Sequence, residues 1–315
     1  MPENAIIQKT KKWWRSPHPG GNRTHLIFTL ATFLITLAIL GFLIYREREI
    51  LLSYQWQIRL WPAIVSFFSF SLALFLAAVL WGWILNTLGS QLDYRKHIQY
   101  YCISNVAKRI PGTLWYIASR AQFYKEENID IKLTSLASGV EMALITLSGI
   151  LASSLFAIPI ILSYNVSPWS LAVIFLMGCF LIHPRIMARI FRLFKVEATM
   201  FNYRDIILWL LSYGLLWIIG GIVLFSIGNA ITPITFQNLG YVIGSWALVG
   251  ILSTLLFFSP SNLGVTEIGL SLLLGQIMPF SVGVIIAILA RLLIIFYEIM
   301  WAFFFLGYRS LFKPD

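Results

Sequence analysis

Long apolar stretches, separated by short polar segments, are the feature of this sequence that most restricts its fold. Lipid offers no hydrogen bonds to a polypeptide backbone, so a segment that crosses a bilayer must be a helix or part of a closed barrel. Only 11% of the 315 residues are charged, against about 25% in soluble proteins, and such a chain cannot cover a surface that faces water. The predicted fold class is therefore all-α, a polytopic membrane protein.

About eight transmembrane helices are predicted, because a helix needs about 20 apolar residues to cross a hydrocarbon core of about 30 Å. The predicted spans are Leu26–Tyr45, Trp61–Leu85, Leu133–Leu162, Trp169–Ile182, Ile206–Ile227, Tyr241–Phe258, Val265–Met278 and Ser281–Tyr308. The fourth and the seventh are short for a full crossing, so we expect either to be tilted or partly re-entrant. One membrane domain, residues 26–308, is expected between a basic tail at 1–25 and a short tail at 309–315.

The basic residues predict the orientation of these spans. With the N-terminus in the cytoplasm, nineteen of the 23 lysines and arginines fall on the inner side and three on the outer side. Cytoplasmic loops of membrane proteins carry such an excess of lysine and arginine. We therefore expect a multi-pass protein of the cell (inner or plasma) membrane with both termini cytoplasmic. The formal net charge of +10 is then topological and does not indicate a nucleic-acid partner.

No metal site or cofactor is predicted. The chain has two cysteines, Cys102 and Cys179, and four widely separated histidines, which fit neither a disulfide framework nor a zinc site. It also lacks the glycine-rich phosphate loop of ATPases. No stretch outside the spans is long enough for a catalytic domain, so any function is expected to lie in the membrane bundle and its inner face.

The segment after the second predicted span is too apolar for an ordinary loop and is interrupted by Pro111 and Gly112, which break a helix. We expect two short helices that meet at this break, in the interface or within the membrane. Cations and amide donors gathered at a helix break suit a phosphate group. An amphipathic interfacial pair of helices, whose basic residues only reach the lipid surface, is the alternative. The candidate binding residues around the break are Asn105, Lys108, Arg109, Trp115 and Arg120.

A second break lies between the sixth and seventh predicted spans. Pro260 stops one helix, Ser261 or Asn262 can cap the next, and Gly264 lets another backbone approach closely. A broken element after the second span of each half suggests an internal duplication, as in transporters whose central site is built from discontinuous helices. The predicted topology makes these repeats parallel, a re-entrant segment counted as a span would change that, and no residue-level repeat supports the duplication.

Four ionisable residues lie within predicted spans, where a charge costs about 2.5–3.5 kcal/mol at the bilayer centre. Each is expected to face protein or water. Arg291 and Glu298 are seven residues apart on one helix face, so partners on other helices are as plausible as a direct bridge. An ion-pair network that fixes helix packing competes with a role in headgroup or proton coupling. The four residues are Glu141, Glu267, Arg291 and Glu298.

The pattern Asn-x-x-Lys-x-x-Pro-Gly-x-x-Trp, from Asn105 to Trp115 and followed by Arg120, resembles the signature of the lysylphosphatidylglycerol synthase transmembrane-region family. The turn Pro260, Gly264 and Glu267 resembles that family's second motif, with Ser-Asn in place of the more usual Gly-Gly. The family consists of flippase-like integral membrane proteins and carries an acidic residue near the position of Glu141. With Lys before Pro-Gly and Trp after it, the chain resembles the family's stand-alone form, which is found beside genes for lipid-glycan synthesis and lacks the aminoacyl-transferase domain.

The resemblance implies a transporter, not an enzyme, that moves an anionic phospholipid or a polyprenyl-phosphate-linked lipid between leaflets during cell-envelope lipid or glycan biosynthesis. Its expected partners are that anionic lipid or lipid-linked glycan precursor, the bilayer, and envelope-synthesis enzymes or further copies of the chain. Two alternatives remain open. One is a membrane-embedded transferase acting on a lipid phosphate, which would need a general base and usually a metal. The other is a non-transporting scaffold for envelope synthesis, which should pack its buried charges without a cavity.

Overall fold

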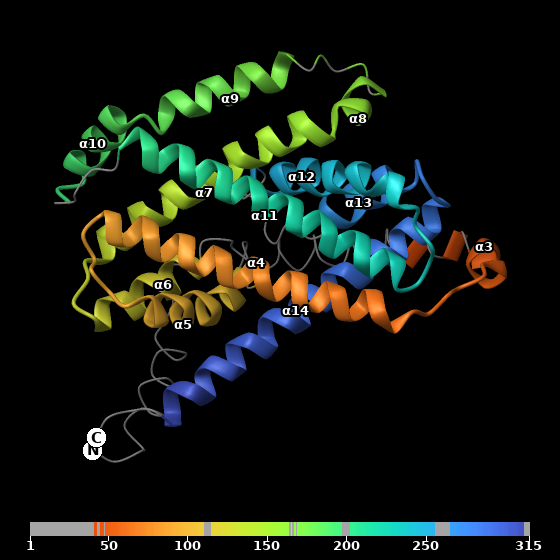
Figure 1. The fold of residues 1–315 in the computed structure, drawn as a ribbon, viewed down its shortest axis with the longest axis horizontal. Coiled ribbons are helices and arrows are strands. Elements are labelled where there is room, and N and C mark those ends of the chain that lie inside the picture. Colours follow the sequence, from red (N-terminus) through yellow and green to blue (C-terminus); the bar gives the residue numbers. More distant parts are fainter. Residues whose placement is uncertain are drawn as a thin grey trace.

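The computed structural model describes residues 41–42, 45–46, 48–109, 115–163, 165, 167, 169–196, 202–255 and 265–311. Every regular element in these ranges is a helix (Figure 1), which confirms the predicted all-α class. The elements are α3 (Arg48–Ser53), α4 (Leu60–Thr87), α5 (Tyr94–Asn105), η1 (Val106–Arg109), α6 (Trp115–Glu126), α7 (Ile131–Phe156), α8 (Ile158–Ser163), α9 (Trp169–Leu181), α10 (Pro184–Leu193), α11 (Tyr203–Asn229), η2 (Phe236–Asn238), α12 (Leu239–Leu255), α13 (Val265–Leu274) and α14 (Phe280–Leu311).

Four of these helices, α4, α7, α11 and α14, are long and apolar enough to cross a membrane, and they match four predicted spans. A fifth candidate is the pair α9 and α10, which is bent by 51° at a short break. The chain is therefore compatible with a multi-pass membrane protein. The predicted number of eight is not confirmed, since four or five candidates occur in the described ranges.

The difference has a physical reason in two predicted spans. The stretch predicted as Val265–Met278 forms α13, a helix of 10 residues, which rises only about 15 Å and cannot cross a core of about 30 Å. Its neighbour α12 has 17 residues, which is at the short end for a span. The first predicted span, Leu26–Tyr45, lies almost entirely outside the described residues.

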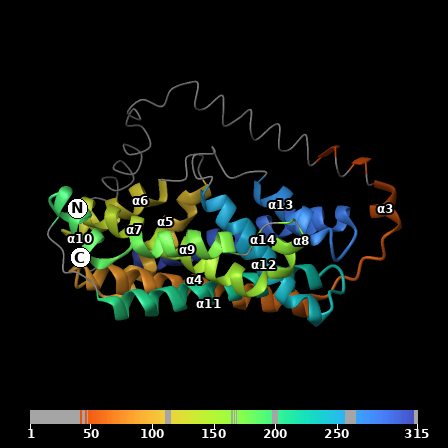
Figure 2. The same cartoon turned by 90° about the horizontal axis from the view of Figure 1, so that it is seen from above.

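The long helices run in two directions. The indole rings of Trp83 and Trp209 lie 5.9 Å apart, and the amide of Arg59 donates to the carbonyl of Ala230 at 2.8 Å. The end of α4 therefore lies beside the start of α11, and these two helices are antiparallel. They form one face of the molecule when it is seen from above (Figure 2), with α5, α6 and α13 on the opposite side.

Helix α14 runs in the same direction as α4. Ser66 contacts the hydroxyl of Tyr297 at 3.0 Å, and one turn further along both helices Ser71 accepts from Trp301, also at 3.0 Å. Helix α7 runs with α11, because Tyr213 donates to Glu141 and Trp217, four residues later, donates to the carbonyl of Ile145.

The short helices α5 and α6 form an antiparallel pair, here called the first helix pair. Lys96 and Glu127 bridge its outer end at 2.6 Å, and Ser104 meets Arg120 near its inner end at 3.5 Å. It lies at the end of the molecule where α4 stops and α7 starts, and it packs on α14 and α7 (Figure 1). The predicted break at Pro111 and Gly112 lies outside the described residues, between η1 and α6.

Helices α12 and α13 form a second antiparallel pair at the opposite end of the molecule, where α11 stops and α14 starts (Figure 1). Tyr241, near the start of α12, donates to the carbonyl of Leu273, near the end of α13, at 2.9 Å. Thr266 donates to Ser253 at 3.4 Å closer to the break. The pair packs on α7 and α14. Pro260 and Gly264, predicted to form the second break, lie outside the described residues.

Close helix packing at the second pair depends on glycine. A Cβ atom added to Gly221 on α11 would lie 2.6 Å from the Cα of Ile243 on α12. A Cβ atom added to Gly244 on α12 would lie 2.6 Å from the carbonyl oxygen of Phe156 at the end of α7. Small residues let membrane helices bring their backbones together in this way. Helix α12 is therefore held tightly between α7 and α11.

Candidate substrate site between the long helices

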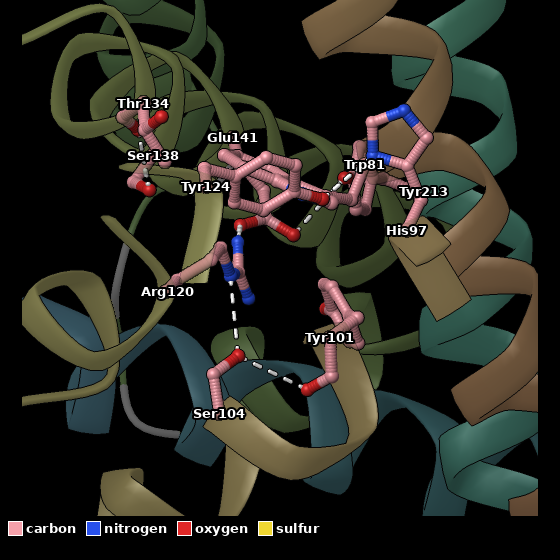
Figure 3. Close-up of polar contacts among 10 residues, drawn as sticks. All are labelled: Trp81, His97, Tyr101, Ser104, Arg120, Tyr124, Thr134, Ser138, Glu141 and Tyr213. Atoms are coloured by element: carbon pink, nitrogen blue, oxygen red, sulfur yellow. Dashed lines mark hydrogen bonds and ion pairs between the residues drawn. The ribbon is translucent and has the colours of Figure 1, made fainter. Parts of the chain in front are cut away.

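Arg120 and Glu141 form a buried ion pair between α6 and α7. The guanidinium Nη1 lies 2.6 Å from the carboxylate Oε2, and the side chains are 0% and 2% exposed. Glu141 also accepts from the hydroxyl of Tyr213 at 3.4 Å. Figure 3 shows Arg120 reaching from its helix toward Glu141 and Ser104. A buried charge is tolerated where it is paired with an opposite charge. The ion pair of Arg120 and Glu141 joins the first helix pair to the long helix α7.

Aromatic rings surround the same guanidinium. The Cζ atom of Arg120 lies 4.1 Å from the ring centre of Trp81, 4.4 Å from that of Tyr101 and 5.3 Å from that of Tyr116. Cations are attracted to the faces of such rings, most strongly when both are removed from water. Nη2 of Arg120 nevertheless has no hydrogen-bond partner. Arg120, a predicted phosphate-binding residue, is thus already engaged by Glu141 and this aromatic cage.

A second ion pair joins α13 to α14, between Glu267 and Arg291. It is less enclosed than the first, because the side chain of Arg291 is 20% exposed. Both Glu298 and a residue of another helix were possible partners of Arg291, and the structure shows that its partner is Glu267. Glu141 lies ten residues after the start of α7 and Arg291 eleven after the start of α14, so each pair lies about 15 Å along its helix.

The third carboxylate, Glu298 on α14, contacts the first helix pair. Its Oε1 accepts a hydrogen bond from Nδ2 of Asn105 at 3.1 Å, and both residues are 6% exposed. This bond fixes the orientation of the amide, because only the NH2 side can donate to a carboxylate. The other side of the amide, Oδ1 of Asn105, is buried and accepts no hydrogen bond.

Asn105, Lys108 and Glu298 line a partly open cavity of about 290 Å³ between the long helices. Lys108 lies on η1, with its ammonium 4.9 Å from the ring centre of Tyr116 and 5.7 Å from that of Tyr101. The remaining lining is mostly apolar and aromatic. It consists of Phe70, Ala73, Leu74, Ala77, Tyr101, Ile145, Tyr213, Leu216, Trp217, Gly220, Val223, Trp246 and Ile294. A small number of polar groups in an apolar wall is typical of a ligand site.

The predicted site residues therefore separate into groups. Three of them line the cavity, and four form the two ion pairs, Arg120–Glu141 and Glu267–Arg291. Trp115 begins α6 with 37% of its surface exposed. Arg109 ends η1, and its side chain lies outside the described part of the chain. The predicted positions Pro111, Gly112, Pro260 and Gly264 also lie outside it.

Sequence analysis missed the aromatic part of this region. Tyr213 and Trp217 lie on α11 one turn apart, and both contact α7. Trp246 reaches the same cavity from α12. A tyrosine hydroxyl in the middle of an apolar span was an available signal, since a buried hydroxyl requires a partner in the membrane. Which helix would supply that partner could not be inferred from the sequence.

A separate buried chain of hydrogen bonds supports the first helix pair. Trp81 donates to the hydroxyl of Tyr124 at 2.7 Å, and that hydroxyl contacts Nδ1 of His97 at 2.6 Å. Nε2 of His97 contacts the amide oxygen of Asn86 at 3.0 Å. The arrangement fits a neutral imidazole with its proton on Nε2. Burial lowers the pKa of His97 to about 4, against smaller raising effects of the Leu92 backbone and Asp93.

The described residues include no group of three histidine, cysteine or acidic side chains that could hold a metal ion. No model of a known protein family matches the chain. No curated protein matches it either.

Proposed function

We propose that the protein is a flippase-like membrane transporter that moves a lipid with a phosphate-bearing head between leaflets. The observation that carries this proposal is the cavity between the long helices, with Lys108, Asn105 and Glu298 in an otherwise apolar and aromatic wall. Membrane interiors exclude polar groups unless these face protein or a watery cavity. Such a cavity can shelter a polar lipid head while the chains of the lipid stay in the bilayer.

In this proposal Lys108 is the residue that attracts the phosphate. An ammonium group binds phosphate as a point charge, and the rings of Tyr101 and Tyr116 hold it beside the cavity. Arg120 has a different role from the one expected from the sequence. Because its charge is balanced by Glu141, it anchors α6 on α7 and thereby positions η1 and Lys108.

We further propose that the two halves, α4–α7 and α11–α14, are inverted repeats. Three features support this. Helix α4 is antiparallel to α11, and α7 is antiparallel to α14; each half contains one helix pair; and the two pairs lie at opposite ends of the molecule. Each pair is also joined to the following long helix by an ion pair, with the signs exchanged between Arg120–Glu141 and Glu267–Arg291. In this proposal the repeats are inverted, whereas the sequence predicted parallel ones.

Inverted repeats suit alternating access, because each half can present the same cavity to a different side of the membrane. We propose that both helix pairs are re-entrant elements, one entering from each leaflet. The exposed arginines of α10, Arg185, Arg189 and Arg192, lie toward the end of the molecule that holds the first pair (Figure 1). By the positive-inside rule we propose that this end is cytoplasmic, with both termini on that side of the cell membrane.

The test is lipid transfer in sealed proteoliposomes that contain a head-labelled phosphate lipid, with a membrane-impermeant quencher added outside. Wild-type protein should expose the inner-leaflet label much faster than protein-free vesicles do. Lys108→Gln should lose most of this acceleration. Lys96→Gln is the matched control, because Lys96 is half-exposed and pairs with Glu127 at the surface, far along α5 from the cavity.

A wild-type protein that transfers no phosphate-headed lipid faster than empty vesicles would refute the proposal. Equal losses of lipid transfer in Lys108→Gln and Lys96→Gln would show that the cavity is not the transport site. If the purified protein instead released a chemically modified lipid, the transferase alternative would replace transport.

A further inference from the structure

The cavity carries complementary charges. Lys108 supplies a cation, whereas Glu298 supplies a carboxylate, and Asn105, which also lines the cavity, is hydrogen-bonded to that carboxylate at 3.1 Å. A site for a simple anion would be expected to hold donors only, because a carboxylate repels phosphate. The two opposite charges therefore indicate a ligand that carries a further polar group besides its phosphate.

The amide of Asn105 restricts the chemical class of the ligand further. Its Nδ2 is used by Glu298, which leaves Oδ1 as a buried acceptor without a partner. More than nine-tenths of the residue is buried. A buried polar atom without a partner is unfavourable, and such atoms mark places where a water or a ligand completes the structure. An amide oxygen can be completed only by an N–H or an O–H group.

We propose that the lipid head bound here carries, next to its phosphate, an N–H or O–H donor, as an amine or a hydroxylated head does. This inference rests on the proposed function. The phosphate lies toward Lys108, and the donor pairs with Oδ1 of Asn105 and the carboxylate of Glu298. Binding requires a local opening at Asn105, since Oδ1 is now closed off from the cavity surface.

Binding to the detergent-solubilised full chain tests this class without any transport. The probes are short-chain phosphatidylethanolamine, with phosphate and N–H donors; phosphatidylglycerol, with phosphate and O–H donors; and phosphatidylcholine, which has the phosphate but no donor. Tryptophan fluorescence reports binding, because Trp217 and Trp246 line the cavity. At least one of the first two lipids should bind about tenfold more tightly than phosphatidylcholine, the factor expected when a buried acceptor loses its partner.

Variants then show which residues cause the preference for a lipid head with a donor over phosphatidylcholine. Asn105→Leu should reduce the preference over phosphatidylcholine to less than about threefold, while Lys108→Gln should weaken all three lipids. Glu298→Gln should reduce binding of the amine more than binding of the hydroxyl head, since it removes only the negative charge. Lys96→Gln should change none of these affinities. Size-exclusion profiles and melting temperatures identify variants that do not fold.

Selective binding of phosphatidylethanolamine, of phosphatidylglycerol or of both supports the proposal and identifies the donor group that the site prefers. Equal binding of all three lipids by the wild type would overturn it, as would an unchanged preference in folded Asn105→Leu. If Asn105→Leu does not fold, the wild-type affinities alone decide. Selective binding without lipid transfer would leave this inference standing and refute the transport proposal instead.

Discussion

The guanidinium of Arg120 lies 2.6 Å from the carboxylate of Glu141 in a part of the protein closed to water, and this pair fastens the first helix pair to α7. Arg120→Ala should lower the free energy of unfolding by about 3–5 kcal/mol, because it leaves Glu141 buried without its counter-charge. Thermal unfolding in detergent measures this loss. The double variant Arg120→Met with Glu141→Met should be more stable than Arg120→Ala, since it removes both charges. A double variant less stable than the single one would contradict the account.

The pair Glu267–Arg291 should be less sensitive. The side chain of Arg291 is partly exposed, so after loss of its partner it can extend toward a polar surface, which the fully enclosed Arg120 cannot do. We expect Glu267→Gln to lower the melting temperature less than Glu141→Gln does. The charge exchange Glu267→Arg with Arg291→Glu should restore most of the loss, because the two positions face each other. No recovery in the exchanged variant would show that the two side chains are not partners in the folded protein.

The buried His97 predicts a dependence of stability on pH. Its pKa is about 4 in the folded protein and about 6.5 when unfolded, so the unfolded chain binds the proton more readily. The stabilising contribution is complete above about pH 6.5 and is lost as the pH falls toward 4, by about 3 kcal/mol at most. Melting temperatures between these values should fall less in His97→Asn than in the wild type. An identical pH dependence in both proteins would contradict a buried neutral imidazole.

Two glycines of α11 provide a matched comparison. Gly221→Ala should lower the free energy of unfolding by about 1–3 kcal/mol, because the new methyl group would meet the backbone of Ile243. Gly214→Ala on the same helix has no atom within 4 Å of its new Cβ. It should be neutral or gain up to about 1 kcal/mol from the higher helix propensity of alanine. Thermal unfolding of both variants distinguishes close packing from a general effect of alanine.

Sequence analysis predicted the long helices well because the length of an apolar run decides whether a helix can cross a bilayer. Leu60–Thr87 and Tyr203–Asn229 differ from the predicted spans only by a few residues at each end. At α12 and α13 the same criterion predicted two crossings, whereas the structure shows two shorter helices that form an antiparallel pair. Hydropathy does not report direction, so two apolar segments separated by a break look like two crossings even when the second returns to the end where the first began.

The buried charged residues could be recognised from the sequence for a similar reason. Charged residues within apolar runs are conspicuous in a sequence, and their burial could be inferred from the cost of placing them in lipid. Their partners could not be inferred, because Arg120–Glu141 and Asn105–Glu298 depend on how α6 and α5 pack against α7 and α14. For that reason Arg120 was named as a candidate binding residue without its protein partner, and the structure shows that it pairs with Glu141.

The central claim is that the cavity beside Asn105 and Lys108 serves both leaflets, and cysteine accessibility tests it most directly. Cys102 and Cys179 would be replaced by serine, and a single cysteine would be placed at Ala73, which lines the cavity. The variant would be studied in sealed proteoliposomes of known orientation. A membrane-impermeant thiol reagent should modify this cysteine when added on either side, and a phosphate lipid should slow the modification. A cysteine that reacts from one side only, or from neither, would contradict the account.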